Sequence, residues 1–182
     1  NAPSPIREEE MWNGYPQPES APYSIAKKMN IVQADAYRRQ YGLHAIVLVP
    51  GNLYGPYDNY NLNDAHVIPA LIRKVYEAQM RGEKQIGAWG TGKPVRDFVY
   101  SRDVARALIV ALETYDQPGI INISSGVQTT IRELYDLVTG LCGFTGTVAW
   151  DTSKPDGQMY KGFDVTRMKT LLGFECATSL RD

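Results

Sequence analysis

Tyr23 and Lys27 are the two residues whose types and spacing most directly suggest chemistry. Residues at this spacing lie on one face of a helix, so both side chains can reach a shared ligand. A free phenol, with a pKa of about 10, is a poor acid or base at neutral pH, and a nearby ammonium favours its phenolate form. Such a pair can exchange a proton with a substrate oxygen. The alternative is a packing tyrosine beside a solvated lysine, since short motifs also arise by chance.

A glycine-rich segment, Gly87-x-x-x-x-Gly92-Lys93, has the spacing of a phosphate-binding P-loop. Its context argues against that function. Pro94 stands where a Ser or Thr should offer a hydroxyl to magnesium, and residues 95–100 favour a strand rather than a phosphate-holding helix. We therefore interpret the segment as a turn between strands. No G-x-G-x-x-G follows a strand, so no dinucleotide pyrophosphate cradle is expected.

The composition excludes several functional classes. Charge is nearly balanced, with 19 Lys and Arg against 20 Asp and Glu, so we expect no nucleic-acid partner and no anionic membrane. No apolar run approaches the ~20 residues that span a bilayer, and no signal-peptide pattern opens the sequence. Cys142 and Cys176 lack a CxxC pattern or a nearby histidine pair. We therefore expect no metal, no disulfide framework and a cytoplasmic location.

Helical and strand-like segments alternate along the chain, which indicates an α/β fold with a mainly parallel sheet. Apolar spacing predicts helices over 22–41, around 68–75, and over 101–112, 130–141 and 165–172. Strands are expected at 45–49, 85–89, 96–100, 120–123 and 147–151. The segments 1–21 and 50–64 are interpreted as loops. Helix boundaries are signalled by candidate caps at Ser20, Gly42, Ser101, Gly173 and a Thr130–Glu133 capping box.

Several segments occur in an order that carries a family resemblance. They are APYSIAKKM, YRRQYG, PGNLYGPYDNY, HVIPALIRK, WGTGKPVRDFVY, TIREL and DTSKPDG. Together they resemble the extended short-chain dehydrogenase/reductase (NAD-dependent epimerase/dehydratase) family, in particular its GDP-L-fucose synthase-like branch of GDP-4-keto-6-deoxymannose epimerase/reductases. The resemblance covers nearly the whole chain, and this context favours a functional role for Tyr23 and Lys27.

The resemblance implies an NADPH-dependent conversion of a GDP-4-keto-6-deoxyhexose to a GDP-6-deoxyhexose such as GDP-L-fucose, with NAD as the alternative to NADP. The partner would be a nucleoside diphosphate sugar. Two alternatives stay open: another NAD(P)-dependent epimerase or dehydratase of such sugars, and a non-catalytic nucleotide-sugar-binding module. The intact enzyme is expected to be a homodimer packed through the helix 22–41.

The resemblance also implies a division of the chain. Residues 1–56 and 96–124 would be the remnant of a Rossmann-type dinucleotide-binding domain, and residues 57–95 and 125–182 a small α/β lobe for the nucleotide sugar. The family begins with a glycine-rich cofactor cradle and a Ser–Cys or Ser–Ser pair, neither of which is matched here. We therefore expect the C-terminal part of such an enzyme. On its own, the chain should bind NADP(H) poorly and either self-associate through the apolar strand 45–49 or be unstable.

The resemblance assigns roles to individual residues. Tyr23 would donate a proton to the sugar C4 oxygen, Lys27 would bind the nicotinamide ribose, and His66 would protonate the sugar ring during epimerisation, a task that suits an imidazole. The catalytic set is therefore Tyr23, Lys27 and His66. The cofactor-binding set is Tyr23, Lys27, Pro50, Asn52, Leu53 and His66. The substrate-binding set is Asn52, Lys74, Trp89, Arg96 and Lys161.

Each of the assigned residues has a structural alternative. His66 can be a histidine at a helix start, Trp89 can be ordinary core packing, and the cations can be solvated surface groups. His44 has no partner motif and is interpreted as structural. Two departures from the family pattern concern substrate and cofactor contacts: residues 158–161 are Gln-Met-Tyr-Lys where the family has a residue followed by Pro-Arg-Lys, and Gly51 replaces a usual threonine.

Overall fold

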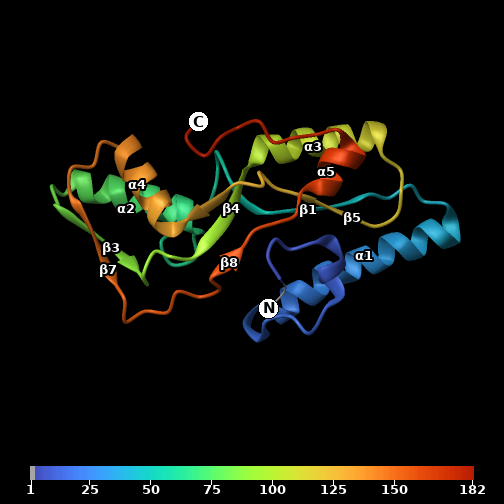
Figure 1. The fold of residues 1–182 in the computed structure, drawn as a ribbon, viewed down its shortest axis with the longest axis horizontal. Coiled ribbons are helices and arrows are strands. Elements are labelled where there is room, and N and C mark those ends of the chain that lie inside the picture. The colour runs from blue at the N-terminus through green and yellow to red at the C-terminus, as the bar shows by residue number, and fades with distance from the viewer. Residues whose placement is uncertain (1–2) are drawn as a thin grey trace.

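The computed structural model describes residues 3–182, so Asn1 and Ala2 of the predicted N-terminal loop lie outside the described residues. It has the predicted α/β fold, in which helices and strands alternate (Figure 1). Two short 3-10 turns, η1 and η2, precede the first long helix. The elements are η1 Glu8–Trp12, η2 Pro18–Ser20, α1 Ala21–Tyr41, β1 Val47–Pro50, β2 Asn52–Tyr54, α2 Val67–Met80, β3 Gln85–Trp89, β4 Val95–Tyr100, α3 Ser101–Thr114, β5 Ile120–Ile123, β6 Gln128–Thr130, α4 Ile131–Leu141, β7 Thr147–Asp151, β8 Tyr160–Lys161 and α5 Thr166–Leu172.

The strands form three small groups rather than one sheet. β1 pairs with β5, and β3 pairs with β7, both in parallel. Between them, β4 pairs in parallel with β2 and β8 and antiparallel with β6. In Figure 1, α2 and α4 lie with β3 and β7 at one end of the molecule, and α3 and α5 lie with β1 and β5 at the other. Strand β4 therefore lies at the junction of the two halves.

Each half has its own hydrophobic core. In one half, α2 and α4 bury apolar side chains against β3, with Leu71, Val75 and Leu134 almost fully buried. In the other, α3 and α5 cover β5, where Ile121, Ile123 and Met168 are almost fully buried. Helix α1 contributes to neither group of buried residues. It is therefore held less by apolar packing than the other long helices.

The helix signals in the sequence are confirmed in part. The Thr130–Glu133 capping box is present at the start of α4, and Gly42 and Gly173 end α1 and α5. Ser101 is not the cap of α3, because Tyr100 occupies that position and no side chain caps the helix. Ser20 occupies the N-cap position of α1, but its hydroxyl donates to the carbonyl of Gln17 at 3.3 Å instead.

Three short strands were not expected from the sequence. β2 lies within the predicted loop 50–64, and β6 and β8 also had no strand signal. The strands β3 and β4 were expected and are confirmed, and the glycine-rich segment between them is a turn as interpreted. They do not form a hairpin, because β3 pairs with β7 while β4 pairs with β2, β6 and β8. Short strands of this kind depend on their partners more than on their own sequence.

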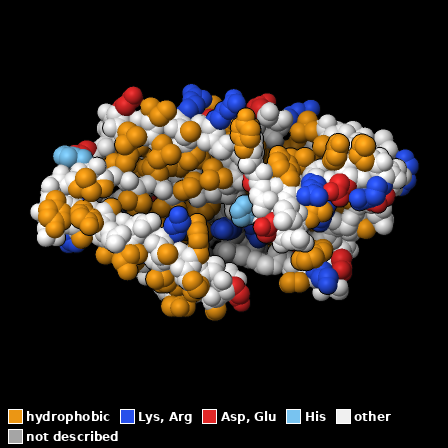
Figure 2. Space-filling view, turned by 180° about the vertical axis from the view of Figure 1, so that it is seen from behind, with side chains coloured by type: hydrophobic (Ala, Val, Ile, Leu, Met, Phe, Trp, Pro, Cys, Tyr) orange, Lys and Arg blue, Asp and Glu red, His pale blue; other side chains and the backbone are white. Residues whose placement is uncertain are grey.

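The apolar stripe of α1 is exposed, whereas that of α3 is only partly exposed, since Val104, Ala107 and Ala111 are buried. Ile25, Met29 and Val32 on α1 are 43%, 52% and 49% exposed, and Leu112 on α3 is 73% exposed. Spacing alone predicts which residues share a face, but not whether that face is covered. Figure 2 shows hydrophobic side chains gathered over the half of the molecule that carries α1, β1 and β5.

The N-terminal segment is fixed to β5 by a buried carboxylate. Glu8 is 5% exposed, and its Oε1 accepts the backbone N–H of Asn122 at 2.9 Å. The side-chain amide of Asn122 donates to the carbonyls of Ile6 and Asp164 at 3.0 and 3.2 Å. Glu8 thus satisfies a backbone donor on the edge of β5, which otherwise would invite pairing with another chain.

The part of the chain that the structure describes contains no helix with the length and hydropathy needed to cross a membrane. Among the same residues, no group of His, Cys, Asp and Glu side chains is arranged to hold a metal ion.

Candidate functional site

Tyr23 and Lys27 lie together near the N-terminus of α1. The Lys27 ammonium is 5.5 Å from the centroid of the Tyr23 ring, so the two side chains share one face of the helix. Tyr23 is 67% exposed, which leaves its hydroxyl accessible to a ligand. The ammonium lies over the ring face, where it attracts the π-electrons of the phenol. The arrangement can present a proton donor and a cation to the same small molecule.

The segment from Pro50 to Leu53 joins the carboxyl end of β1, which runs parallel to β5, to the start of β2. Ligands of open α/β sheets bind at such ends. The amide nitrogen of the Asn52 side chain donates to the carbonyl of Asp97 in β4 at 2.7 Å, which fixes the segment to the centre of the molecule. Pro50 and Leu53 are exposed, the latter by 41%.

The structure explains the glycine at position 51. A β-carbon on Gly51 would lie 2.3 Å from Oγ of Ser124, closer than non-bonded atoms approach, and would make a tight contact of 3.3 Å with the Phe163 ring. A threonine at this position would therefore collide with Ser124. The Ser124 hydroxyl is fully buried, and among the buried side-chain N and O atoms of the described residues it is the one without a hydrogen-bond partner. Gly51 and Ser124 are thus sterically matched.

Arg96 and Lys161 form a pair of neighbouring cations. They are register partners in the parallel pairing of β4 with β8. Arg96 donates through Nη1 to the carbonyls of Val95 and Gln158 at 2.8 and 2.7 Å. Within residues 3–182, neither side chain has a carboxylate oxygen within 4.0 Å of its nitrogens.

Burial alters the titration of this cation pair. It lowers the pKa of the Lys161 ammonium, and the charge of Arg96 lowers it further. Burial also lowers the pKa of the Arg96 guanidinium. Both shifts mean that the charged forms are less favourable here than in water, which is the condition that a bound anion relieves. The pair is therefore suited to a phosphate or diphosphate group.

The other predicted residues lie on separate elements. His66 is exposed at the N-cap position of α2, where its side chain makes no capping hydrogen bond, and Lys74 is partly buried further along the same helix. Trp89 ends β3 with 71% exposure, which is inconsistent with core packing, and the Lys154 ammonium lies 5.9 Å from its ring centroid. Among residues 3–182, no hydrogen bond or ion pair joins the Tyr23–Lys27 pair to the Arg96–Lys161 pair. Figure 2 shows Lys and Arg side chains gathered around a hollow near the middle of the molecule.

A carboxylate-binding turn was missed by the sequence analysis. Residues Gly90 to Gly92 form a turn in which the backbone N–H and the hydroxyl of Thr91 both donate to Asp156, at 2.6 and 2.8 Å. These donors lower the pKa of the Asp156 carboxyl. The available sequence signal is the glycine-rich spacing of residues 87–93, which indicates a turn but does not identify Asp156 as its partner.

Two partly buried groups, Tyr54 and Cys176, are held in their neutral forms. Burial, reinforced by the nearby Asp103 carboxylate, raises the pKa of Tyr54 to about 12, and burial with Asp103 and Asp97 raises the pKa of Cys176 to about 11. The Tyr54 hydroxyl donates to the carbonyl of Ser179 at 3.2 Å, and Asp103 accepts the backbone N–H of Thr178 at 2.9 Å. These groups attach the C-terminal segment to the molecule and are poor bases at neutral pH.

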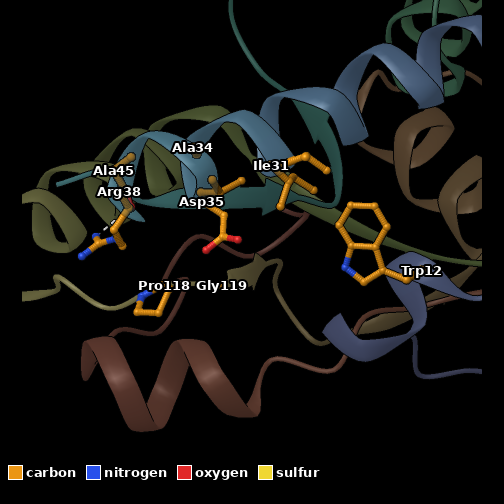
Figure 3. A pocket seen from close by; sticks show the side chains of 10 residues that line it. Trp12, Ile31, Ala34, Asp35, Arg38, Ala45, Pro118 and Gly119 are labelled. Atoms are coloured by element: carbon orange, nitrogen blue, oxygen red, sulfur yellow. Dashed lines mark hydrogen bonds between the residues drawn. The ribbon is translucent and has the colours of Figure 1, made fainter. Parts of the chain in front are cut away.

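A groove lies between α1 and the first strand. It has a volume of roughly 350 Å³ and is lined by Trp12, by α1 side chains such as Ile31 and Arg38, by Val47 of β1, and by Pro118 (Figure 3). Most of the lining groups are apolar, and Asp35 and Arg38 are the charged members. None of the residues proposed for catalysis lines it.

Comparison with known proteins gives a consistent result. A family model described as the NAD dependent epimerase/dehydratase family matches residues 1–124. A GDP-L-fucose synthase of Sinorhizobium fredii is 44% identical over 179 residues, which cover 98% of this chain and 57% of the relative. GDP-L-fucose synthase 1 of Arabidopsis thaliana is 41% identical and is matched over 100% of this chain and 56% of its own length. The chain thus spans somewhat more than half the length of these relatives.

Solved structures agree with the sequence relatives. A GDP-L-fucose synthetase from Naegleria fowleri bound to NADP superposes with a TM-score of 0.92 at 30% identity, over 100% of this chain and 58% of that one. A UDP-glucose 4-epimerase from Thermotoga maritima with UDP-glucose superposes less closely, with a TM-score of 0.75 at 31% identity over 93% of this chain. The expected Rossmann-type α/β fold is confirmed by these superpositions.

Proposed function

The chain belongs to the NAD-dependent epimerase/dehydratase family, and we propose that it carries the nucleotide-sugar site of an NADPH-dependent epimerase/reductase acting on a GDP-4-keto-6-deoxyhexose. The observation that carries this proposal is the Arg96–Lys161 pair, two partly buried cations without a carboxylate partner among the described residues. A diphosphate supplies the negative charge that such a pair lacks. The names of the relatives from Sinorhizobium fredii and Arabidopsis thaliana support a GDP-sugar and GDP-L-fucose as the product.

The residues proposed for proton transfer have the chemistry that this reaction requires. Tyr23, with its exposed hydroxyl, donates a proton to the C4 oxygen of the keto-sugar as that carbon is reduced. Lys27 stabilises the resulting phenolate by its charge. His66, exposed beside α2, exchanges protons with the sugar ring during epimerisation. Asn52 and Trp89 bind the sugar, and Lys74 adds a further cation for the substrate phosphates.

The described residues suit the nicotinamide end of NADPH. Pro50 ends β1, and Asn52 and Leu53 follow at the start of β2, so a ring can bind beside the carboxyl end of a parallel strand, and Lys27 offers a cation to a ribose hydroxyl. When bound, NADPH supplies the hydride for the C4 ketone. NAD is the alternative cofactor.

The test is an absorbance assay on the protein expressed over its full open reading frame, with NADPH and a GDP-4-keto-6-deoxyhexose. We expect NADPH to be oxidised, and Tyr23→Phe to lower kcat by roughly 10²-fold or more, the range typical of a lost general acid. Tyr15→Phe is the matched control, since Tyr15 is exposed and lies outside the proposed site. Absence of turnover with this and related keto-sugars would exclude the assignment.

We also propose a homodimer that packs through α1. The helix exposes Ile25, Met29 and Val32 on one stripe, and an apolar surface of this kind favours burial against a second copy. Cys142 and Cys176 are both unpaired, in keeping with the proposed cytoplasmic location.

A further inference from the structure

The turn Gly90–Gly92 does bind an anionic group, which is the carboxylate of Asp156 in the same chain. We propose that the bond between this turn and the Asp156 carboxylate positions Arg96 and Lys161 for the substrate diphosphate, so that Thr91 and Asp156 are positioning residues for substrate binding. The inference rests on the proposed function, because it assumes that the Arg96–Lys161 pair receives the diphosphate.

The carboxylate of Asp156 is held at both oxygens. Thr91 donates its backbone N–H to Oδ1 at 2.6 Å and its hydroxyl to Oδ2 at 2.8 Å. Hydrogen bonds to an ionised carboxylate are among the stronger ones in proteins. The carboxyl pKa is lowered by these two bonds, so the carboxylate is ionised and both bonds are present at neutral pH.

The two glycines of the turn allow this close approach. Gly90 has φ +75°, and a β-carbon there would lie 2.2 Å from Oδ1 of Asp156. Gly92 has φ +76°, and a β-carbon there would lie 2.7 Å from the Trp150 ring. A side chain at either position would therefore displace the turn from the carboxylate or from the tryptophan.

The turn is itself anchored to a rigid element. The carbonyl of Gly92 accepts the backbone N–H of Arg132 in α4 at 2.9 Å, and Nη2 of Arg132 donates to the carbonyl of Thr91 at 2.9 Å. The Arg132 guanidinium also lies 4.5 Å from the centroid of the Trp150 ring. Asp156 is thus connected through the turn to a well-packed helix.

Beyond Asp156, the chain is held continuously against β4. The carbonyl of Gln158 accepts the hydrogen bond from Arg96 at 2.7 Å, and the carbonyl of Met159 accepts the N–H of Val95 at 2.7 Å. Lys161 follows two residues later as the register partner of Arg96. The segment 156–161 therefore sets the position of both cations. Its Lys161 end is paired with β4, and its Asp156 end is fixed to Thr91.

The test is calorimetric binding of GDP, with the protein expressed over its full open reading frame, combined with steady-state kinetics. We expect Asp156→Ala to weaken GDP binding by roughly tenfold, the effect of losing charge-assisted hydrogen bonds. Thr91→Val, which keeps the shape and the N–H but lacks the hydroxyl, should weaken binding less. Thr91→Ser should restore wild-type affinity.

Kinetics separate positioning from a general loss of structure. We expect the KM for the GDP-sugar to rise in Asp156→Ala and Thr91→Val, while the KM for NADPH and kcat change little. Ser153→Ala is the matched control in the same loop. Among the described residues its hydroxyl bonds to Asp151 alone, at 2.6 Å, so the variant should leave both KM values unchanged.

The outcomes distinguish the two proposals. If wild-type protein does not bind GDP, both the proposed function and this inference fall. If wild-type protein binds GDP and Asp156→Ala binds it equally well, only the positioning role falls. If Asp156→Ala does not fold, Thr91→Val decides: an unchanged dissociation constant and an unchanged KM for the GDP-sugar overturn the inference.

Discussion

At the scale of single residues, burial makes Cys176 much less reactive than an ordinary thiol. Burial and the Asp103 and Asp97 carboxylates raise its pKa from the ordinary value of 9.0 to about 11. At pH 9 an ordinary thiol is half ionised, whereas Cys176 is ionised to about 1%. Because the thiolate is the reactive form, iodoacetamide at pH 9 should label Cys176 roughly 50-fold more slowly in the folded protein than in the unfolded chain. Mass spectrometry of the Cys176 peptide in buffer and in urea measures the ratio, and equal rates would contradict the structure.

The contact between Gly51 and Ser124 predicts a specific pattern of stabilities. A β-carbon on residue 51 would meet Oγ of Ser124 at 2.3 Å, so Gly51→Ala should lower the free energy of unfolding by about 1–3 kcal/mol, as overpacking does. Ser124→Ala removes a buried hydroxyl that has no hydrogen-bond partner within residues 3–182, and it should be neutral or stabilising.

The double variant Gly51→Ala/Ser124→Gly tests whether the two effects are coupled. Removing the Ser124 side chain relieves the collision, so the double variant should recover most of the loss caused by Gly51→Ala. Urea unfolding of the wild type, Gly51→Ala, Ser124→Gly and the double variant gives the coupling free energy. Strictly additive effects would mean that the two residues do not share this space.

At the scale of elements, the sequence predicts helices well where both the pattern and the covering surface lie within the chain. Helix α2 has its apolar residues buried as the spacing predicts, with Leu71 and Val75 almost fully buried. Helix α1 has an equally regular stripe, but its Met29 and Val32 remain exposed because no described element covers them. Strand β8 consists of two residues, and its partner β4 determines its conformation more than its own sequence does.

The capping box of α4 gives a prediction about pH. The Thr130 hydroxyl accepts the Glu133 N–H at 3.1 Å, while the Glu133 carboxylate accepts from the backbone and hydroxyl of Thr130 at 2.7 Å each. Thr130→Ala should lower the free energy of unfolding at neutral pH by about 1 kcal/mol. The comparison is made by urea unfolding.

The carboxylate half of the box should be lost in acid. The Thr130 donors hold the pKa of Glu133 below its ordinary value of 4.5 in the folded protein. A lowered folded-state pKa stabilises the protein above the unfolded-state pKa, and this stabilisation disappears as the pH falls through the folded-state value. The stability difference between wild type and Glu133→Gln should therefore shrink below a pH of about 4.5, and a constant difference would show that the bond does not depend on charge.

At the scale of the whole molecule, the candidate site depends on contacts between segments that are distant in sequence. Arg96 and Lys161 are both predicted to bind substrate, but no sequence signal places them side by side, because β8 has no strand pattern of its own. The role of Thr91 could not be predicted from the sequence either, because its partner Asp156 lies in another loop, 65 residues away in the sequence. Residue types predict the chemistry, whereas the pairing of β4 with β8 determines which residues act together.

The exposed apolar surface around α1 predicts how the 182-residue chain behaves in solution. The stripe of Ile25, Met29 and Val32 adjoins the groove that α1 forms with β1, and both lie in the half of the molecule where hydrophobic side chains gather (Figures 2 and 3). Apolar surface of this extent favours association. Sedimentation velocity from micromolar to submillimolar concentration should therefore detect dimers or larger species.

Substitutions distinguish this surface from other exposed apolar groups. Met29→Asp and Val32→Asp place a charge in the stripe and should shift the chain toward monomer. Tyr76→Asp is the matched control, because Tyr76 is 61% exposed on α2 in the other half of the molecule. If the wild-type chain is monomeric throughout, or if Tyr76→Asp lowers association as strongly as Val32→Asp, the α1 surface does not drive self-association. A selective effect of Met29→Asp and Val32→Asp would instead support α1 as the dimer contact, because the same stripe would then be the surface that the chain buries.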